Sequence, residues 1–387
     1  MIKISLKHVV YSFVMLCLSL IIVLMLGEVL LRFFWVKPTG VDLSGITVKD
    51  ETLGYRFVPN SSAIITGLMN DYQTSVKINS YGFRGREHDI ENKLKKKRII
   101  LIGDSVVFGL GTGEEDNIDT AMERLLNANN SNSYEVINLG MPGIGTLAEE
   151  QILIFHGLLY KPGIVIFFVN AINDLGDNVN YYNSHSIQVS SKTNNRISSK
   201  SNDLNTFHLF KISESYLFNF IKWQMRPFIL KSQILRKAIL FFYKPSVEDL
   251  PSFREWYTEE GLAGFSLMKA AFERISVLGN QHNFKINIAV IPSRPQFDKS
   301  YEYLSKAVLP PDILEEYNKD PQKPQRLIRE FCKDKSIGYI ELLDDLIYLQ
   351  NKSRDIPLTH PNDGHPKAQY SKEVARIVVG ELQKRVL

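Results

Sequence analysis

The stretch RIILIGDS, residues 98–105, decides the fold. Four aliphatic residues run from Ile99 to Ile102 and stop at Gly103, which is typical of a short strand buried on both faces. A polar pair, Asp104 and Ser105, follows at once. The stretch therefore predicts a buried strand that presents a serine hydroxyl at its carboxyl end.

Similar apolar runs recur along the chain, at 134–139, 164–169, 285–291 and 338–342. Segments with the length of a helix separate them, and the clearest are 118–127, 148–159, 264–278 and a final amphipathic one at 369–384. Strands that alternate with helices form a parallel sheet with helices on both faces. We therefore expect an α/β protein, a flavodoxin-like three-layer sandwich around a central parallel sheet.

The composition of the 387 residues, 44% hydrophobic and 23% charged, is that of an ordinary globular protein. The net charge of +4 is mild and its basic residues are scattered, which argues against a nucleic-acid partner. The dense run KKKR at 95–98 is interpreted as a solvated loop. Cys17 lies in an apolar stretch and is not expected to pair with Cys332, and no zinc-type spacing appears, so we expect neither metal nor cofactor.

The N-terminus, residues 1–37, is expected to be a membrane anchor. No charged residue occurs from 9 to 27, and about 20 apolar residues in a helix span a bilayer core of about 30 Å. A cleaved signal peptide or a lipoprotein signal would need a small-residue site or a cysteine after the core, and neither is present. Lys3 and Lys7 favour a cytoplasmic N-terminus, although basic residues beyond the span weaken the asymmetry. The remaining chain is then periplasmic or extracellular.

A polar segment rich in Gly and Asn, residues 38–97, separates the anchor from the first strand, and we call it the collar. The alternation SVKI at 75–78 indicates a short strand pair. In its motif NSYGFRG, Tyr81 and Arg84 are candidates to border the active site; the simpler interpretation is a plain connector.

The main domain, residues 98–387, contains an insertion at about 175–250. The first part, 180–205, is rich in Asn and Ser and is expected to be a surface loop. The second part, 213–244, is aromatic, aliphatic and basic. It is interpreted as helices that cover the sheet, or else as a lid that contacts lipid head groups.

Three predicted strands end in residues suited to acyl transfer. Ser105 follows the first strand and is exposed for attack if a tight turn presents it. The second ends in NLGMPGIG, residues 138–145, where glycines let a backbone N–H approach a ligand. The third ends in NAIND, residues 170–174, where an Asn side chain is a second donor to an oxyanion. An ordinary glycine turn and helix capping by Asn or Asp are the alternatives.

The sequence THPNDGHP, residues 359–366, precedes the final helix. Histidine, with an ordinary pKa of about 6.5, is suited to take a proton from serine and return it to a leaving group. His365 is the expected base and His360 the alternative. A nearby Asp would fix the tautomer of the base and stabilise its imidazolium.

Together these residues resemble the SGNH/GDSL hydrolase family, which is named after a Ser, a Gly, an Asn and a His. The resemblance covers about 97–387. It implies that Ser105 is the nucleophile and His365 the base. It also implies an oxyanion hole formed by the N–H groups of Ser105 and Gly143 and the side chain of Asn173.

Two positions depart from the family pattern. The third block usually reads Gly-x-Asn-Asp, and Ala171 replaces that glycine. The last block usually has Asp three residues before the His, where this chain has Asn362, while Asp363 lies two before. We expect Asp363 to orient His365, and a weaker Ser–His dyad is the alternative. The motif NSYGFRG behind a single anchor also resembles membrane-anchored bacterial members.

The resemblance implies a membrane-anchored serine esterase that acts on acyl esters, O-acetyl esters of a cell-surface glycan above all. If a sugar hydroxyl resolves the acyl-enzyme, the protein is an O-acyltransferase, with a membrane-bound acyltransferase as a candidate partner. A glycan-binding or assembly protein of weak activity and a lipid-acting esterase are further alternatives. Arg294, which follows the strand at 285–291, is a candidate contact for an anionic substrate.

Overall fold

The computed structural model describes residues 6–34, 41–129, 132–193, 216–217, 220–221, 252–299, 301–302, 306, 309–353 and 356–385. They belong to two units. The first comprises Met1–Thr39 and Arg196–Lys244, and the second comprises Gly40–Asn195 and Pro245–Leu387.

The first unit contains helix α1 (Leu6–Phe34). Its stretch Tyr11–Phe34 is long and apolar enough to cross a membrane, and a signal sequence near an N-terminus has the same character. Near its end, the Glu28 carboxylate accepts hydrogen bonds from the backbone N–H groups of Tyr216 and Leu217, at 3.0 and 2.8 Å. Apart from 216–217 and 220–221, the segment expected to form a cover or lid at 213–244 lies outside the described residues.

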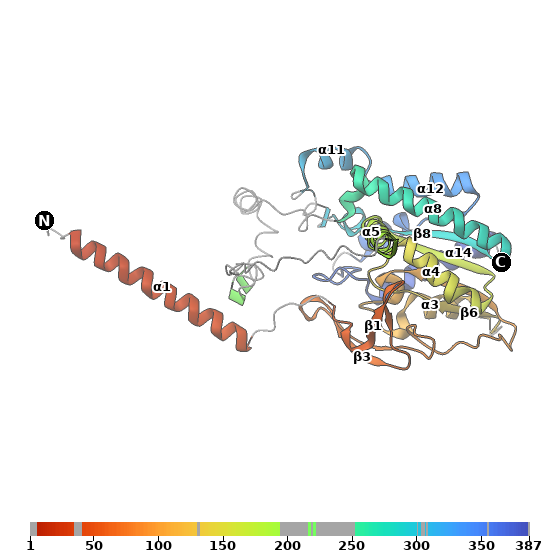
Figure 1. Ribbon diagram of the computed structural model, residues 1–387, viewed down its shortest axis with the longest axis horizontal. Coiled ribbons are helices and arrows are strands. Elements are labelled where there is room, and N and C mark those ends of the chain that lie inside the picture. Colours follow the sequence, from red (N-terminus) through yellow and green to blue (C-terminus); the bar gives the residue numbers. More distant parts are fainter. Residues whose placement is uncertain are drawn as a thin grey trace. The chain divides into compact units, whose positions relative to one another are not determined.

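The second unit is built on a parallel sheet. Its strands are β5 (Lys97–Gly103), β6 (Tyr134–Asn138), β7 (Ile164–Asn170), β8 (Lys285–Ile291) and β9 (Gly338–Ile340). They lie in the order β6-β5-β7-β8-β9, and all neighbours are parallel (Figure 1). This is the flavodoxin-like order, in which the switch point lies between β5 and β7. All five strands expected from the sequence are confirmed.

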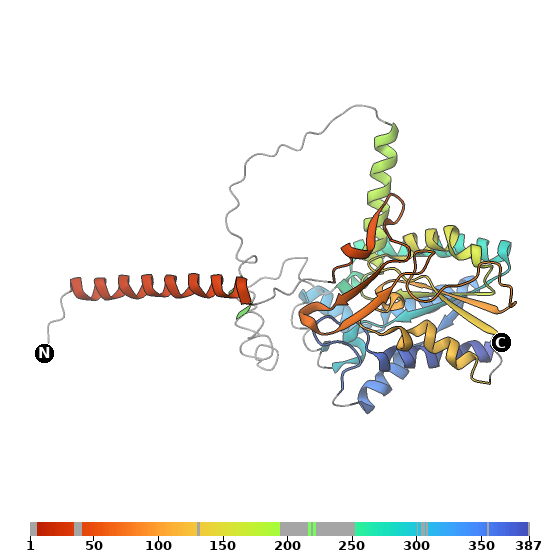
Figure 2. The same cartoon turned by 90° about the horizontal axis from the view of Figure 1, so that it is seen from below.

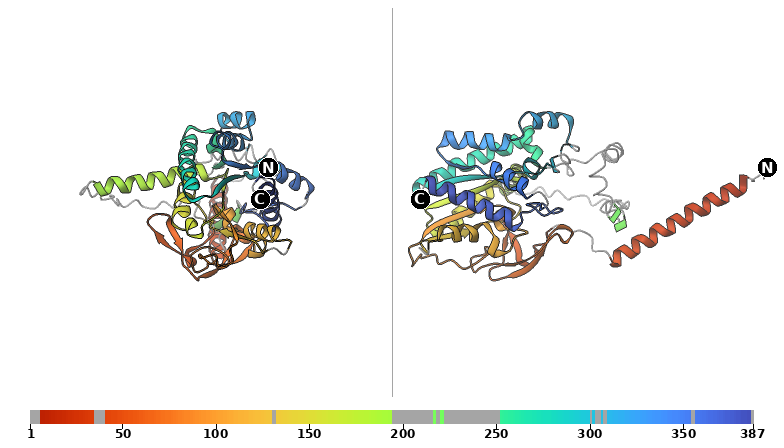
Figure 3. Two further views of the ribbon diagram at one scale, coloured as in Figure 1. Left: turned by 90° about the vertical axis from the view of Figure 1, so that its right-hand side faces the viewer. Right: turned by 180° about the vertical axis from the view of Figure 1, so that it is seen from behind.

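Helices cover both faces of the sheet. One face carries α4 (Thr146–Phe155), α8 (Glu259–His282) and α12 (Lys323–Lys335), and the other carries α3 (Ile118–Leu126), α13 (Leu343–Lys352) and α14 (Ala368–Arg385). Figures 2 and 3 show the sheet between these layers, with α3 beside α14. Strand residues alternate between the two cores, with Ile100 in one and Leu101 in the other. The three-layer α/β sandwich is therefore confirmed.

Shorter elements lie in the connections: α2 (Ser105–Phe108), η3 (Glu114–Asp116), η4 (Gly157–Tyr160), η7 (Ser252–Tyr257), α9 (Arg294–Phe297) and α11 (Pro311–Lys319). Among them α2 has the largest part in the site, because it begins directly at the carboxyl end of β5.

The prediction of a surface loop at 180–205 is wrong for its first part, because helix α5 runs from Asp174 to Thr193 (Figure 2). Leu175 and Tyr181 of α5 pack on the core, and the Asn178 side chain accepts the Leu147 N–H at 2.9 Å. This inward face stabilises a helix whose Asn- and Ser-rich composition is typical of loops. Residues 194–205 lie outside the described residues.

The collar forms two antiparallel hairpins. Strand β1 (Thr47–Asp50) pairs with β2 (Gly54–Phe57), and β3 (Ser62–Thr66) pairs with β4 (Gln73–Lys77), which confirms the expected strand pair. The short helices η1 (Ser44–Ile46) and η2 (Leu68–Asn70) flank them. The ring of Phe57 stacks on that of Phe108 in α2, with centroids 5.0 Å apart. The collar therefore shares one hydrophobic core with the sheet.

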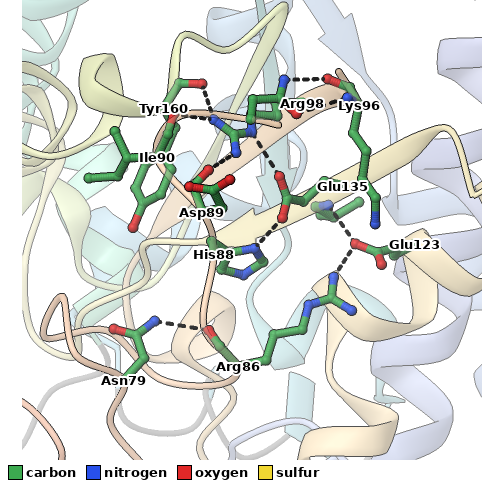
Figure 4. A network of polar contacts seen from close by, with 12 residues as sticks. Asn79, Arg86, His88, Asp89, Ile90, Lys96, Arg98, Glu123, Glu135 and Tyr160 are labelled. Atoms are coloured by element: carbon green, nitrogen blue, oxygen red, sulfur yellow. Dashed lines mark hydrogen bonds and ion pairs between the residues drawn. The ribbon is translucent and has the colours of Figure 1, made fainter. Parts of the chain in front are cut away.

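A buried ion pair fixes the end of the collar (Figure 4). Arg98, expected in a solvated run, is instead buried, because it starts β5 and pairs in register with Glu135 of β6. Its Nε donates to Glu135 at 2.7 Å, and His88 contacts the other carboxylate oxygen at 2.9 Å. The guanidinium also donates to three carbonyls, those of Asp89, Ile90 and Tyr160. Burial raises the pKa of Glu135, but the hydrogen bonds from His88 and Arg98 outweigh it and lower the pKa to about 2.

We predict that Glu135→Gln destabilises the fold by about 3 kcal/mol, because it leaves the buried Arg98 charge without a carboxylate. Urea unfolding at pH 7 measures this loss. Since the pKa of Glu135 in the fold lies below the ordinary 4.5, the stabilisation is fully present above about pH 4.5 and is lost as the pH falls towards 2. The control is Glu91→Gln, which breaks only the exposed pair with Lys93. Equal stability of both variants at pH 7 would contradict this role.

Candidate active site

Ser105 begins α2 immediately after β5, at the carboxyl edge of the sheet. The Asp104 side chain caps this short helix by accepting the Val106 N–H at 2.9 Å. The side chain of Asn170, at the end of β7, donates to the other oxygen of Asp104 at 2.8 Å. These bonds tie the turn of the serine to the neighbouring strand at the switch point, where ligands bind in sheets of this order.

The expected base lies against the serine. The Nε2 atom of His365 is 3.0 Å from the Oγ atom of Ser105. The Nδ1 atom of His365 contacts the carboxylate of Asp363 by a hydrogen bond. Because a carboxylate only accepts, Nδ1 carries the proton, and Nε2 is left to accept the serine hydroxyl proton. The structure thus brings Ser105, His365 and Asp363 into one hydrogen-bonded line.

Asn362, at the family's usual Asp position, faces elsewhere. Its side-chain amide donates to Asp71 of the collar at 2.6 Å, and its backbone N–H donates to the same carboxylate at 2.5 Å. The Asp363 N–H adds a third hydrogen bond to Asp71 at 2.9 Å. Held in this way, the loop turns Asp363 towards His365 even though the two are only two residues apart.

The collar also satisfies the carboxylate of Asp363. Its Oδ2 atom accepts the Leu68 N–H at 2.9 Å, and its Oδ1 atom accepts the Tyr72 hydroxyl at 3.3 Å. Burial raises the pKa of Asp363, but the hydrogen bond and charge of His365, followed by the Leu68 N–H, outweigh it and hold the pKa below its ordinary value. The carboxylate is therefore ionised at neutral pH.

The alternative base, His360, has a different partner. Its side chain is buried and its Nε2 atom lies 2.9 Å from the Gly111 carbonyl oxygen. Burial lowers the pKa of His360, and this effect outweighs that of the hydrogen bond to Gly111, which raises the pKa. His360 makes no hydrogen bond to Ser105 among the described residues, and its place is structural.

The loop after β6 closely approaches the turn that carries the candidate nucleophile Ser105, residues 104–112, which we call the nucleophile turn. A Cβ atom at Gly140 would lie 2.3 Å from the backbone nitrogen of Phe108, so only glycine fits there. Gly143 has a positive φ of 72° and is exposed, which leaves its N–H near the surface at the carboxyl edge. The hydroxyl of Tyr55 donates to the carbonyl of Pro142 at 2.5 Å.

Asn173 follows β7 at the same edge. Its side-chain amide donates one hydrogen bond to Asp177 at 2.6 Å, and the second amide hydrogen is the one suited to an oxyanion. Burial raises the pKa of Asp177 to about 6 against the opposing effect of this bond. Neither Asn173 nor Gly143 bonds to Ser105 or His365 among the described residues, so their place on neighbouring strand ends is what links them to the site.

A group of buried acids lies beneath these loops and was missed from the sequence. Glu149 of α4 is fully buried, and neither of its carboxylate oxygens has a hydrogen-bond partner among the described residues. Burial, followed by the charges of Asp104 and Asp177, raises the pKa of Glu149 well above its ordinary value. Burial and the charge of Glu149 do the same for the pKa of Asp174. The carboxyl groups of Glu149 and Asp174 therefore keep their protons in the folded chain.

Arg84 braces the nucleophile turn instead of lining its surface. Its buried guanidinium donates to three backbone carbonyls beyond Ser105, those of Phe108, Gly109 and Thr112, at 3.0, 2.5 and 2.6 Å. Tyr81, the other collar candidate, lies near Tyr160, which precedes β7, with ring centroids 6.0 Å apart. It is therefore close to the amino end of that strand, opposite the site.

Arg294 stabilises the loop at 359–366, which carries His365. The guanidinium is buried and donates at 3.2 Å to the carbonyls of His360 and Pro361, and it pairs with Asp298 at 3.3 Å. This geometry accounts for Arg294 as a structural group, and contact with an anionic substrate stays a prediction.

The collar residues Tyr55, Asp71 and Tyr72, which contact the loops of the site, were not identified from the sequence. Asp71 and Tyr72 reach partners 291 residues away, and Tyr55 reaches one 87 away. No local pattern marks such contacts. The one available signal was the mismatch at Asn362, which required some outside group to hold the loop.

No protein-family model matches the chain, and no curated protein matches it in sequence. Solved structures do match. The acetyl xylan esterase AlAXEase has 12% identity over 75% of this chain and 100% of its own, with a TM-score of 0.37. The acetylxylan esterase Axe2 from Geobacillus stearothermophilus, in a form with a catalytic substitution, has 10% identity over 74% and 94%, with a TM-score of 0.38.

A protein from Desulfitobacterium hafniense DCB-2, described as lipolytic and of the G-D-S-L family, has 12% identity over 74% of this chain and 100% of its own, with a TM-score of 0.35. Because TM-scores this low say nothing about activity, the function has to rest on the residues of the chain itself.

We predict that Glu149→Gln stabilises the fold increasingly as the pH rises. The pKa of Glu149 is raised above the ordinary 4.5, so the wild-type fold loses stability above about pH 4.5, where the unfolded chain releases this proton and the fold retains it. Glutamine has no proton to lose. We expect a melting temperature about 2 °C or more above wild type at pH 8, for a gain of about 1 kcal/mol, and a smaller difference at pH 5.

Thermal unfolding at the two pH values checks this, with the exposed Glu115→Gln as the matched control. A difference between Glu149→Gln and wild type that is the same at both pH values would show that Glu149 is not held protonated.

Proposed function

We propose that this chain is a serine esterase that hydrolyses acyl esters. The single observation that carries the proposal is the hydrogen-bonded line from the Ser105 hydroxyl through His365 to the Asp363 carboxylate. It lies at the carboxyl edge of the sheet, directly after β5, where a nucleophile is accessible to substrate. The side chain of His365 is about one-fifth exposed, at 21%, so substrate can reach it, while that of Asp363 is 4% exposed.

The reaction proceeds in two steps. The Oγ atom of Ser105 attacks the ester carbonyl carbon, and Nε2 of His365 takes the hydroxyl proton. The tetrahedral intermediate collapses, the C–O bond to the alcohol breaks, and His365 returns the proton to the leaving oxygen. Water then attacks the acyl-serine with His365 again as the base, which releases the carboxylic acid and restores Ser105.

Two charges develop during the reaction, a positive one on His365 and a negative one on the carbonyl oxygen, and each has a partner in the proposed mechanism. The Asp363 carboxylate stabilises the imidazolium of His365. The oxyanion accepts hydrogen bonds from the N–H groups of Ser105 and Gly143 and from the amide of Asn173. One such donor contributes about 3 to 4 kcal/mol to the transition state. Ala171, which stands at the position of the glycine in the family pattern, has its side chain buried in the core.

For the substrate class we propose O-acetyl esters of a cell-surface glycan, with α1 as the membrane anchor and the hydrolase unit outside the cytoplasm. The apolar stretch Tyr11–Phe34 supports the anchor through its length and composition. Esterase activity on p-nitrophenyl acetate, butyrate and octanoate tests the acyl group. A preference for acetate supports the glycan proposal, whereas a preference for octanoate points to a lipid ester.

We predict that Ser105→Ala and His365→Ala each lower kcat for p-nitrophenyl acetate by at least about 10³-fold, because each removes a group that bonds to the reacting atoms. Both should also abolish labelling by a fluorophosphonate. The measurement uses the full-length chain in mild detergent.

His360→Asn is the matched control, because His360 belongs to the same loop and an amide can still donate to the Gly111 carbonyl. It should keep most of the activity. If His360→Asn were as inactive as His365→Ala, the assignment of His365 as the base would be wrong. Labelling of Ser105 without hydrolysis would instead favour transfer of the acyl group to a sugar hydroxyl.

A separate prediction concerns Asp363→Asn, which keeps the size of the side chain and removes its charge. We expect kcat to fall by about 10²- to 10⁴-fold, because the amide favours the wrong tautomer of His365 and leaves the imidazolium unstabilised. Asn362→Ala, measured beside it, should lose far less. If Asn362→Ala were the more damaging of the two, the base would not depend on Asp363.

A further inference from the structure

We propose that the two hairpins of the collar each position one half of the active site, through Tyr55 for the oxyanion hole and Tyr72 for the base. Neither tyrosine would touch the substrate, so both are positioning residues. The inference rests on the proposed function and extends it to residues outside the motifs of the resemblance.

The first hairpin acts on the peptide between Pro142 and Gly143. The Tyr55 hydroxyl donates to the Pro142 carbonyl oxygen at 2.5 Å. That oxygen and the Gly143 N–H belong to the same planar trans peptide and point in opposite directions. Fixing the oxygen therefore fixes the direction of the N–H that serves the oxyanion.

This peptide needs such a support. Proline followed by a residue of positive φ, here 72° at Gly143, fits a type II turn. The type I and type II turns differ by a flip of this central peptide, and glycine tolerates both. The hydrogen bond from Tyr55 favours one orientation. A donor on the carbonyl also polarises the amide and strengthens its N–H as a donor.

Tyr55 is itself well held. It lies on β2, opposite Lys49 of β1, and its ring packs edge-on to Phe57 with centroids 5.7 Å apart. Phe57 in turn stacks on Phe108 in the nucleophile turn. Burial, followed by the charge of Asp104, raises the pKa of Tyr55 above its ordinary value, so the hydroxyl remains a donor throughout the neutral range.

The second hairpin acts on the base. Tyr72 directly precedes β4, and its hydroxyl donates to the Asp363 carboxylate at 3.3 Å. The centroid of its ring lies 4.6 Å from that of the His360 ring. Leu68 and Asp71, in the turn between β3 and β4, hold the same carboxylate and its backbone. Asp363 is thus oriented towards His365 from the collar side.

The test compares Tyr55→Phe and Tyr72→Phe in the full-length chain with a matched control, Tyr257→Phe. Tyr257 also donates its hydroxyl to a backbone carbonyl, that of Asp320 at 2.9 Å, but outside the active-site loops. All three changes remove one oxygen and keep the ring. The measurements are kcat and KM for p-nitrophenyl acetate, the rate of fluorophosphonate labelling, and the melting temperature.

We expect Tyr55→Phe and Tyr72→Phe each to lower kcat and the labelling rate about tenfold with KM unchanged, a fraction of the loss from deleting an oxyanion donor. The double variant should lose about a hundredfold, because the two act on separate groups. Tyr257→Phe should keep the wild-type kcat, even where its melting temperature falls as much. In proton NMR, Tyr72→Phe should shift the downfield signal of the His365 Nδ1–H, and Tyr55→Phe should leave it in place.

Wild-type kcat in Tyr55→Phe and Tyr72→Phe, or an equal loss in Tyr257→Phe, overturns the inference and leaves the proposed function intact. A wild-type chain that neither hydrolyses the ester nor reacts with the fluorophosphonate overturns the proposed function, and the inference with it.

Discussion

The buried guanidinium of Arg84 is the interaction on which the rest of the site depends. It comes from the collar and donates to three carbonyls of the turn that carries Ser105. A buried charge without such partners costs several kcal/mol, and the carbonyls at the end of a short helix need donors in return. Each side therefore satisfies the other, and the hydrogen bonds hold the nucleophile turn and the collar together.

The collar thereby unites loops that the sheet only brings near each other. In the proposed mechanism the strand ends supply the reactive groups, since Ser105 follows β5 and Asn173 follows β7. Parallel strands place such groups at one edge but do not set their directions. The directions come from hydrogen bonds that cross from the collar, and Asn362 illustrates this. The chain departs from the family spacing there, and Asp71 supplies the hold that lets Asp363 face His365.

The sequence predicted the sheet well because buried parallel strands have a strong local signature. Runs such as 164–169 are apolar throughout, and inspection of the strand ends led to Ser105. His365 and Asp363 came instead from the motif at 359–366, which precedes the final helix. Helix α5 was missed because its Asn and Ser residues hide a narrow inward face. The burial of Arg98 and the contacts of Tyr55 were missed for another reason. They depend on partners distant in the chain, and no window of sequence contains both members.

The hydrogen bond from Leu68 to Asp363 joins residues 295 positions apart. During synthesis, the collar leaves the ribosome long before the loop that carries Asp363 and His365. A nascent chain therefore carries Ser105 long before it contains His365, which lies 260 residues further along the chain. Contacts of such long range also slow folding, because the loop they close is costly in entropy. Under the proposed mechanism, Ser105 thus becomes reactive only once the loop of His365 has been made and has folded against it, a form of protection that needs no inhibitor and no cleavage.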